Sequence, residues 1–250
     1  MVDCNRLKNI ILASHITGVY DVNRNTTLLN DDFEIVSEWV NSIKMLDLHG
    51  IIFHNNFSEQ TCKKYASKNI QFIKIDYNEQ FNPNVFRYFI YDQFLKKYSK
   101  SIQNVFFTDV ADVVVLKNPF IQKIFIENPT TIFCGDEQEI LDNQWMKQHS
   151  EHLRTKIIDY TTFEHNFKDD TLLNCGVVGG SIQIMQPFIQ KLWHIHEHYN
   201  SDNSTNYTGD MGAFNYLMRT QFNQLLLHGK PVNTPFKKYI VDNECWFKHK

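Results

Sequence analysis

The segment from Asn104 to Phe120 constrains the fold of this chain more than any other. An apolar run rich in β-branched and aromatic residues leads to two acids, Asp109 and Asp112, and a second apolar run follows them. Asn, Lys and Pro bound both runs, and this pattern is typical of strands. Because open α/β sheets bind their ligands at the carboxyl ends of strands, we expect the two acids to lie at such an edge.

Two interpretations of Asp109 and Asp112 are open on their spacing alone. A buried carboxylate is costly without a cationic partner, so the pair favours a site for a hard divalent cation such as Mg²⁺ or Mn²⁺. The alternative is a turn in which Asp109 caps the following segment and Asp112 is hydrated. Short motifs also match by chance, so the rest of the chain has to decide between these interpretations.

Short apolar runs alternate with amphipathic stretches along the first half of the chain. The helix after Asp31 carries apolar residues at helical spacing from Phe33 to Leu46, and Asp31 with Glu34 forms a variant of the capping box. Such alternation predicts an α/β fold with a mostly parallel, doubly wound sheet flanked by helices, which is Rossmann-like. The expected strands are 9–14, 50–54 and 70–75 besides the run before Asp109, and the expected further helices are 58–67 and 85–98.

The alternation is weaker after Phe120. A strand is expected over 130–133, and residues 138–170 are polar with isolated Trp145 and Tyr160, which predicts an irregular insert or lid. Such a segment either contacts substrate or only decorates the surface, and the sequence does not separate the two. A helix is expected over 185–199 with Pro187 in its first turn, and another helix begins at Asp210.

A window of five residues, 176–180, contains three glycines: Gly176, Gly179 and Gly180. The window closely follows the apolar pair Leu172-Leu173. This pattern predicts a strand whose backbone is closely approached by another group, or a β-bulge. It does not match the phosphate-binding loop, which needs Gly-x-x-x-x-Gly-Lys before a helix.

Composition excludes several classes of protein. The chain has 250 residues, of which 42% are hydrophobic and 21% charged, and its net charge of −3 argues against a nucleic-acid-binding surface. The five cysteines contain no Cys-x-x-Cys pair, and the longest apolar run near the N-terminus is too short for a signal peptide or a membrane span. We therefore expect a cytoplasmic protein without a membrane span or a nucleic-acid partner, whose oligomeric state is open.

Histidines offer further candidate ligands. His194 and His198 are four residues apart on one helix, where a hydrated face is favoured over a metal site. His228 precedes Gly229 and Lys230, and His249 precedes Lys250 at the chain end. Either His228 or His249 could reach a cation at the central acids, and the neighbouring lysine could neutralise phosphate.

As a whole, the pattern resembles the metal-dependent glycosyltransferases of the GT-A fold, the nucleotide-diphospho-sugar transferases. The resemblance covers most of the chain. It implies one domain over 1–250, with a nucleotide-binding half at about 1–120 and a donor-sugar and acceptor half at about 121–250. The motifs that carry it are Asp21-Val22-Asn23-Arg24, Asn84-x-x-Arg87-Tyr88, Thr108-Asp109-Val110-Ala111-Asp112, Asn174-Cys175-Gly176-Val177-Val178-Gly179-Gly180, and Asp210 ahead of Phe214-Asn215, with the histidines near the end.

Roles for individual residues follow from this resemblance. The family's Asp-x-Asp motif holds Mn²⁺ or Mg²⁺ against the nucleotide diphosphate, and a histidine near the C-terminus often completes the coordination. Here the spacing is Asp-x-x-Asp, so which acid contacts the metal and which the ribose stays open. The resemblance implies Asp109, Asp112 and His249 (favoured over His228) as metal ligands, Asp21, Arg24, Asp109, Gly176, Gly179, Gly229 and Lys250 around the donor nucleotide, and Arg87, Asn174 and Asp210 as catalytic residues.

The implied activity is transfer of a hexose from a UDP-sugar, such as UDP-glucose, to an unknown sugar, protein or glycan acceptor, with the retaining branch favoured. A sugar-1-phosphate nucleotidyltransferase is an alternative. It would need a glycine-rich loop after the first strand, where this chain has only Gly18. A second alternative is a catalytically silent carbohydrate- or partner-binding module of the same fold.

Overall fold

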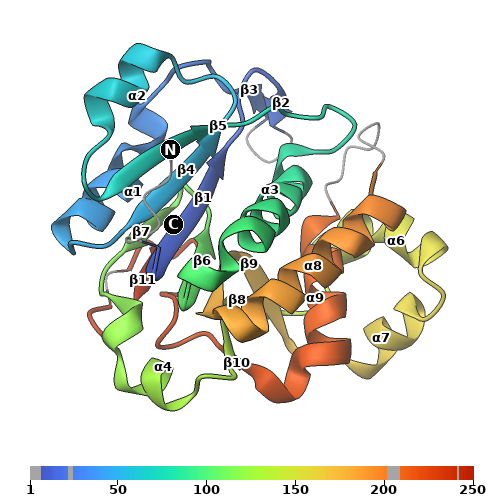
Figure 1. The fold of residues 1–250 in the computed structure, drawn as a ribbon. Helices are drawn as coiled ribbons and strands as arrows, with labels where there is room; N and C mark the ends of the chain where they lie inside the picture. Colours follow the sequence, from blue (N-terminus) through green and yellow to red (C-terminus); the bar gives the residue numbers. More distant parts are fainter. Residues whose placement is uncertain (1–6, 22–24, 202–208, 241) are drawn as a thin grey trace.

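A seven-stranded sheet runs through the molecule, with helices on both of its faces (Figure 1). The computed structural model describes residues 7–21, 25–201, 209–240 and 242–250. Among the seven strands only β9 runs antiparallel to its neighbours, so the prediction of a mostly parallel α/β sheet is confirmed. In spatial order the strands are β10 (Leu226–His228), β8 (Ile132–Ile140), β9 (Thr171–Ser181), β6 (Asn104–Thr108), β1 (Asn9–His15), β4 (Gly50–His54) and β5 (Ile70–Lys74).

Strand β1 lies in the middle of the sheet and is apolar on both faces. Ile10 and Leu12 pack into one hydrophobic cluster, and Ile11 and Ala13 pack into the other. This arrangement explains why its sequence is a continuous apolar run instead of an alternating one. The first cluster includes residues of α3 (Pro83–Tyr98), α8 (Ile182–Tyr199) and α9 (Asp210–Leu217), and the second includes residues of α1 (Glu34–Met45) and α4 (Lys123–Glu127).

Helix α1 buries the face that its spacing predicts, through Val36, Trp39, Val40 and Ile43. The capping box predicted for it is wrong. Phe33 occupies the N-cap position and makes no side-chain cap, while the Asp31 carboxylate accepts a hydrogen bond from the Ser58 N–H at 2.7 Å. Asp31 therefore binds the backbone of the residue just before α2 (Glu59–Tyr65), because that segment of the chain passes close to Asp31.

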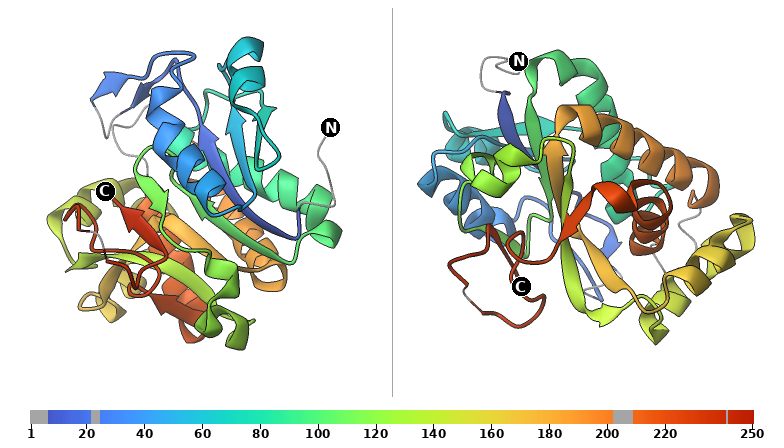
Figure 2. Two further views of the ribbon diagram at one scale, coloured as in Figure 1. Left: turned by 90° about the vertical axis from the view of Figure 1, so that its left-hand side faces the viewer. Right: turned by 90° about the horizontal axis from the view of Figure 1, so that it is seen from below.

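The C-terminal segment returns to the acidic motif. Strand β11 (Phe247–His249) pairs antiparallel with β7 (Val113–Val115) near the chain end marked C (Figure 2). In this register His249 lies opposite Val113. The Lys250 N–H donates to the Asp112 carbonyl at 2.9 Å. Trp246 and Phe247 are buried against the ring of Phe106 in β6. These apolar contacts anchor the chain end beside the central strand.

The second half differs from the predicted pattern in three places. Strand β8 extends to Ile140 instead of ending at Phe133. Pro187 lies inside α8, because that helix begins at Ile182 and not at Met185. Residues 138–170 are not irregular but contain three short helices, which bury one or two residues each, such as Leu153 and Phe163. These helices are α5 (Gln144–His149), α6 (Glu151–Lys156) and α7 (Tyr160–Asn166).

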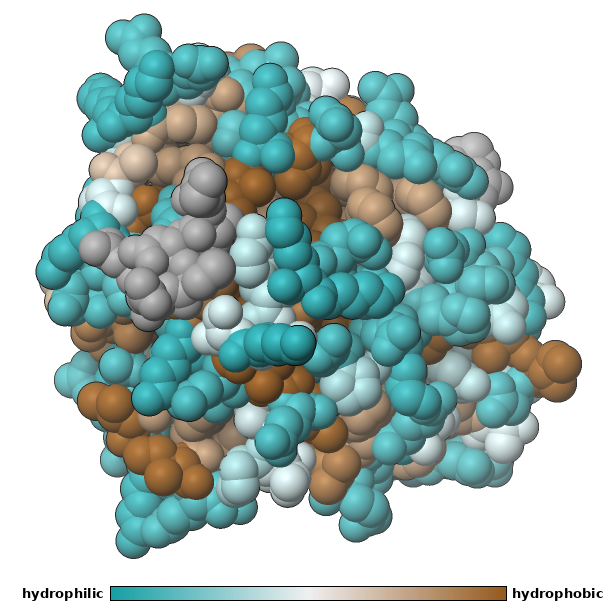
Figure 3. Space-filling model, in the orientation of Figure 1, coloured by the Kyte–Doolittle hydropathy of each residue, from teal (hydrophilic) through white to brown (hydrophobic). Residues whose placement is uncertain are grey.

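The face of the molecule seen in Figure 1 is mainly hydrophilic, and its apolar side chains form separate patches (Figure 3). Within the described ranges, none of the helices combines the length and apolarity that crossing a bilayer requires. The four described cysteines, Cys62, Cys134, Cys175 and Cys245, are free thiols.

Candidate functional site

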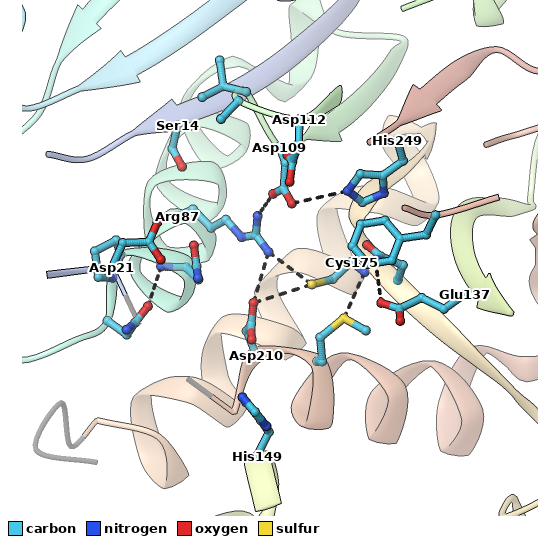
Figure 4. A pocket seen from close by; sticks show the side chains of 18 of the residues that line it. Ser14, Asp21, Arg87, Asp109, Asp112, Glu137, His149, Cys175, Asp210 and His249 are labelled. Atoms are coloured by element: carbon cyan, nitrogen blue, oxygen red, sulfur yellow. Dashed lines mark hydrogen bonds and ion pairs between the residues drawn. The ribbon is translucent and has the colours of Figure 1, made fainter. Parts of the chain in front are cut away.

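A cavity of about 900 Å³ opens at the carboxyl ends of β1 and β6, close to the upper limit of about 1,000 Å³ for small-molecule sites. β4 and β6 lie on opposite sides of β1, so the connections diverge here, and open α/β sheets bind ligands at such a point. The first half contributes the end of β1, the hairpin strand β2 (Tyr20–Asp21) and the start of α3, and the second half contributes β8, β9, α5 and α9. Seven predicted site residues line this cavity: Asp21, Arg87, Asp109, Asp112, Asn174, Asp210 and His249 (Figure 4).

Asp109, Asp112 and His249 form a compact cluster of candidate metal ligands. One ligand atom from each lies within 4.8 Å of the others, and His249 Nε2 is 4.0 Å from Asp109 Oδ2. Ligands that share one small divalent ion at about 2.1 Å lie at most about 4.2 Å apart, so the cluster needs little adjustment to close around an ion. The pairing of β7 with β11 brings the histidine to the acids and selects His249 over His228 as their neighbour.

Gly176 leaves room beside this cluster. A Cβ atom added to it would lie 2.5 Å from His249 Cε1 and 2.6 Å from Asp109 Oδ2. The ladder between β8 and β9 also slips at this point, because Val178 pairs with Cys134 whereas Asn174 pairs with Gly135. Both interpretations of the glycine segment therefore hold, since the strand bulges and two side chains closely approach its backbone.

His249 is held in the protonation state that a metal ligand needs. Burial lowers its pKa to about 4, with a further contribution from the Arg87 cation against the attraction of Asp109, so the imidazole is neutral at neutral pH. Its ring packs on Phe236 at a centroid distance of 4.5 Å. The buried Nδ1 makes no hydrogen bond with any described residue. Two carboxylates, a neutral imidazole and the space beside Gly176 together fit a divalent cation such as Mn²⁺ or Mg²⁺.

The guanidinium of Arg87 joins the cluster to the acid on α9. It forms an ion pair with Asp109 Oδ1, and its Nη2 lies 3.4 Å from Asp210 Oδ2 and 3.2 Å from Cys175 Sγ. The Arg87 and Asp210 side chains are 7% and 9% exposed. In Figure 4 Arg87 lies between the two acids. Its positive charge is therefore shared by two protein carboxylates, which the sequence did not predict.

Asp210 is the first residue of α9, and the N-cap position is Gly209 with a φ of 64°. The predicted helix start at Asp210 is therefore confirmed, and Asp210 itself lies in the first turn and not at the N-cap position. The Cys175 Sγ lies 3.7 Å from its Oδ2. Burial raises the pKa of the Cys175 thiol well above its usual value, which favours the protonated sulfur.

Asn174 is held in place by two hydrogen bonds. Its Nδ2 donates to Glu137 Oε1 at 2.8 Å, and its Oδ1 accepts the Gly176 N–H at 2.7 Å. Burial raises the pKa of Glu137, against the effect of that bond to Asn174. Glu137 was missed as a site residue, although it lies only four residues beyond the strand that the sequence predicts over 130–133. Trp145 and His149, which also line the cavity, were missed because α5 is too short to show periodicity.

Other predicted site residues lie outside the cavity lining. Gly179 faces the Phe106 ring, which an added Cβ would overlap, so core packing explains this glycine. The φ of Gly229 is 69° and the residue sits against Asp136, which lies 2.8 Å from His228 Nδ1. Lys250 pairs with Glu38. Arg24 is outside the described residues. The nucleotide contacts that the resemblance implies for these four residues remain predictions.

A second group of metal-ligand type lies on the exposed face of α8, formed by His194, Glu197 and His198. His198 Nδ1 is 2.9 Å from the His194 carbonyl, so one ring nitrogen is bonded to the helix backbone. None of these three residues lines the cavity, and none belongs to the cluster of Asp109, Asp112 and His249.

A scan of protein-family models gives no match to this chain, and a search of curated proteins gives none either. The function therefore has to be inferred from the residues that line the cavity. Its described lining contains six carboxylates but only two permanently cationic side chains, Arg87 and Lys237. Such a cavity repels anionic ligands unless it also holds a cation.

Proposed function

We propose that this chain is a metal-dependent glycosyltransferase of the GT-A type, which transfers a hexosyl group from a UDP-sugar such as UDP-glucose to an acceptor hydroxyl. One observation carries the proposal. The cluster of Asp109, Asp112 and His249 lies at the point where the sheet connections diverge, and buried Arg87 links it to Asp210. This arrangement supports a cation site next to a site for a polar, uncharged group.

The cation site suits a nucleotide diphosphate. Asp109, Asp112 and His249 would hold Mn²⁺ or Mg²⁺, which supplies Lewis-acid stabilisation of the charge that develops on the departing diphosphate. The six carboxylates of the cavity would otherwise repel that diphosphate. Metal dependence is thus a direct consequence of the charge of the lining.

The uridine would occupy the end of the cavity beside β1. Ile16, Val19 and Leu28 provide apolar surface there, Tyr20 provides an aromatic ring, and Asp21 provides a carboxylate. Apolar side chains with a few polar groups are typical of sites for a base and ribose, and a carboxylate is a suitable acceptor for ribose hydroxyls.

The hexose would lie beside Asp210 and Asn174. The carboxylate and the amide bind sugar hydroxyls, and Arg87 fixes Asp210 with respect to Asp109. An acceptor oxygen attacks the anomeric carbon, the bond from that carbon to the diphosphate oxygen breaks, and its electron pair leaves with UDP. The acceptor proton passes to the departing diphosphate oxygen and then to water. A metal-binding histidine near the end of the domain resembles the retaining GT-A glycosyltransferases, so His249 favours transfer with retention of configuration.

Hydrolysis of UDP-sugars in Mn²⁺ without any acceptor tests the proposal. We expect release of UDP from at least one UDP-sugar, and calorimetry should show UDP binding with Mn²⁺ that disappears in EDTA. Equal UDP affinity with and without metal contradicts the cation site. Formation of UDP-sugar from UTP and sugar-1-phosphate would identify the nucleotidyltransferase instead, and metal-dependent binding without turnover would identify a silent module.

A further inference from the structure

One tryptophan of this chain is exposed in the cavity. Trp145 is 42% exposed and lines the cavity, whereas Trp39, Trp193 and Trp246 are at most 8% exposed. Single exposed apolar residues are common on protein surfaces, but this indole lies in the lining of a cavity, where covering its large aromatic surface with a ligand would be strongly favourable. Trp145 is therefore the first candidate for a contact with a second substrate.

The indole ring has a fixed orientation. Asn143 caps α5 by accepting the Met146 N–H at 2.9 Å, which sets the start of the helix. His149 lies one turn later and stacks on the Trp145 ring at a centroid distance of 3.8 Å and an angle of 22°. Its Nδ1 donates to the Trp145 carbonyl at 2.8 Å. One face of the indole is thus covered, and the exposed remainder forms a rigid platform.

This platform is close to the proposed reaction centre. His149 and Asp210 both line the cavity that holds Trp145. In Figure 4 His149 lies directly beyond Asp210, on the side away from Asp109. A molecule stacked on Trp145 would therefore meet the donor hexose from the side opposite the diphosphate.

Side chains with hydrogen-bond acceptor oxygens line the same cavity as this platform. Glu137, Glu139 and Asn143 line the same cavity as Trp145, and each can accept a hydrogen bond from a hydroxyl. An acceptor with a phosphate group would be repelled by these acids. The lining instead suits a neutral molecule that has an apolar face for the indole and several hydroxyl donors along its edges, which describes a pyranose ring.

We infer that the acceptor is a neutral carbohydrate, whose terminal ring stacks on Trp145 and presents one hydroxyl to the donor beside Asp210. This inference rests on the proposed function and names its acceptor class. The hydroxyl oxygen forms the new glycosidic bond as the bond to the diphosphate breaks, and the hydroxyl proton leaves with UDP and passes to water. A serine or threonine of a protein is the alternative nucleophile.

The experiment supplies the full chain with Mn²⁺, the UDP-sugar that it hydrolyses best, and a panel of p-nitrophenyl glycosides, Ser/Thr peptides and a polyprenyl phosphate. We expect transfer to glycosides with saturation. Trp145→Ala should raise the glycoside KM about tenfold, equivalent to about 1.4 kcal/mol, and Trp145→Phe should recover most of that loss. The ratio of transfer to donor hydrolysis should fall in Trp145→Ala. Ile158→Ala, at a fully exposed apolar residue outside the cavity, is the matched control.

Binding gives a readout that does not depend on turnover. Because the other three tryptophans are buried and methyl glycosides do not absorb in the near ultraviolet, titration with the matching methyl glycosides should change the fluorescence of Trp145 in the wild type and leave that of Trp145→Phe unchanged. Transfer to peptides or to the lipid phosphate alone would overturn the inference. So would an unchanged KM in Trp145→Ala, or an equal loss of transfer and hydrolysis. If no UDP-sugar is hydrolysed, the proposed function fails, while the fluorescence change with methyl glycosides still decides whether this subsite exists.

Discussion

A methyl group on Gly176 would lie 2.5 Å from Cε1 of His249, so the glycine and the histidine cannot both keep their places once any side chain is added. Gly176→Ala should displace His249 from Asp109 and weaken Mn²⁺ binding, with an overpacking cost of about 1–3 kcal/mol in unfolding free energy. Calorimetric Mn²⁺ titration and chemical unfolding measure the two effects. Gly135→Ala is the control, because its Cβ would come no closer than 3.4 Å to Asn233. Equal Mn²⁺ affinity in both variants would contradict this account of Gly176.

The choice between two histidines gives a second prediction. His249→Ala should lower Mn²⁺ affinity by at least the roughly 10–100-fold that loss of a metal's outer-shell partner costs, because it removes a direct ligand. His228→Ala removes only the contact with Asp136 and should bind Mn²⁺ like the wild type. Electron paramagnetic resonance of bound Mn²⁺ measures both affinities. The reverse result would assign His228 as the ligand.

Arg87 should be important for stability. Removing one partner of a buried ion pair costs about 3–5 kcal/mol, so Arg87→Met should lower the unfolding free energy by that amount. Lys63→Met breaks an ion pair whose side chains are 79% and 90% exposed, and we expect a change below about 1 kcal/mol. Urea unfolding of the two variants makes the comparison. A small effect at Arg87 would mean that the charges of Asp109 and Asp210 need no internal cation.

Asp210→Asn separates a role in sugar binding from a role in the fold. The amide keeps an oxygen that can accept from Arg87 but loses the charge, so the melting temperature and UDP binding with Mn²⁺ should stay close to those of the wild type. A charged hydrogen bond to a sugar hydroxyl contributes about 1.5–3 kcal/mol, so turnover of the UDP-sugar should fall roughly ten- to a few hundredfold. Turnover at the wild-type rate would remove Asp210 from the list of catalytic residues.

Acid should destabilise the fold partly through His196. Burial lowers the pKa of this fully buried imidazole to about 3, with the Arg87 cation acting in the same direction, while the unfolded chain keeps a pKa near 6.5. Its contribution is therefore complete above about pH 6.5 and is lost as the pH falls toward 3, by at most about 1.4 kcal/mol for each pH unit. In His196→Gln, the slope of unfolding free energy against pH should be smaller over pH 4.5–6.5. His194→Gln, at the surface of the same helix, controls for loss of an imidazole. An unchanged slope in His196→Gln would refute this prediction.

Local signals predicted much of the framework. Gly50–His54 is a strand over the predicted residues, and the ends of α1 and α3 lie within two residues of the predicted ones. Each of these elements has strong periodicity or a continuous apolar run, and both signals can be read within a single window of sequence. The acids after β6 were also recognisable, because two carboxylates between apolar strands have few structural reasons to be there.

Contacts between distant segments could not be read in the same way. The pairing of β7 with β11 decides that His249 meets Asp109, but three-residue strands show no pattern of their own. Glu137 and Trp145 enter the cavity because β8 is longer than its apolar run and because α5 packs against α9, which single-sequence periodicity does not reveal. Gly179 illustrates a related limit, since a glycine that accommodates a phenylalanine ring looks the same in the sequence as one that approaches a ligand.

The ladder between β7 and β11 also has a consequence for the order of folding. It joins the last residues of the chain to a strand near its middle, so the closure of a very long loop opposes this step entropically. The parallel strands β1, β4, β5 and β6 can associate before that loop closes. The cation site would then form after these strands have associated. A bound ion would stabilise the state in which β11 is paired with β7. Chelators would accordingly slow or oppose the docking of the final strand, because only the docked chain holds all three candidate ligands together.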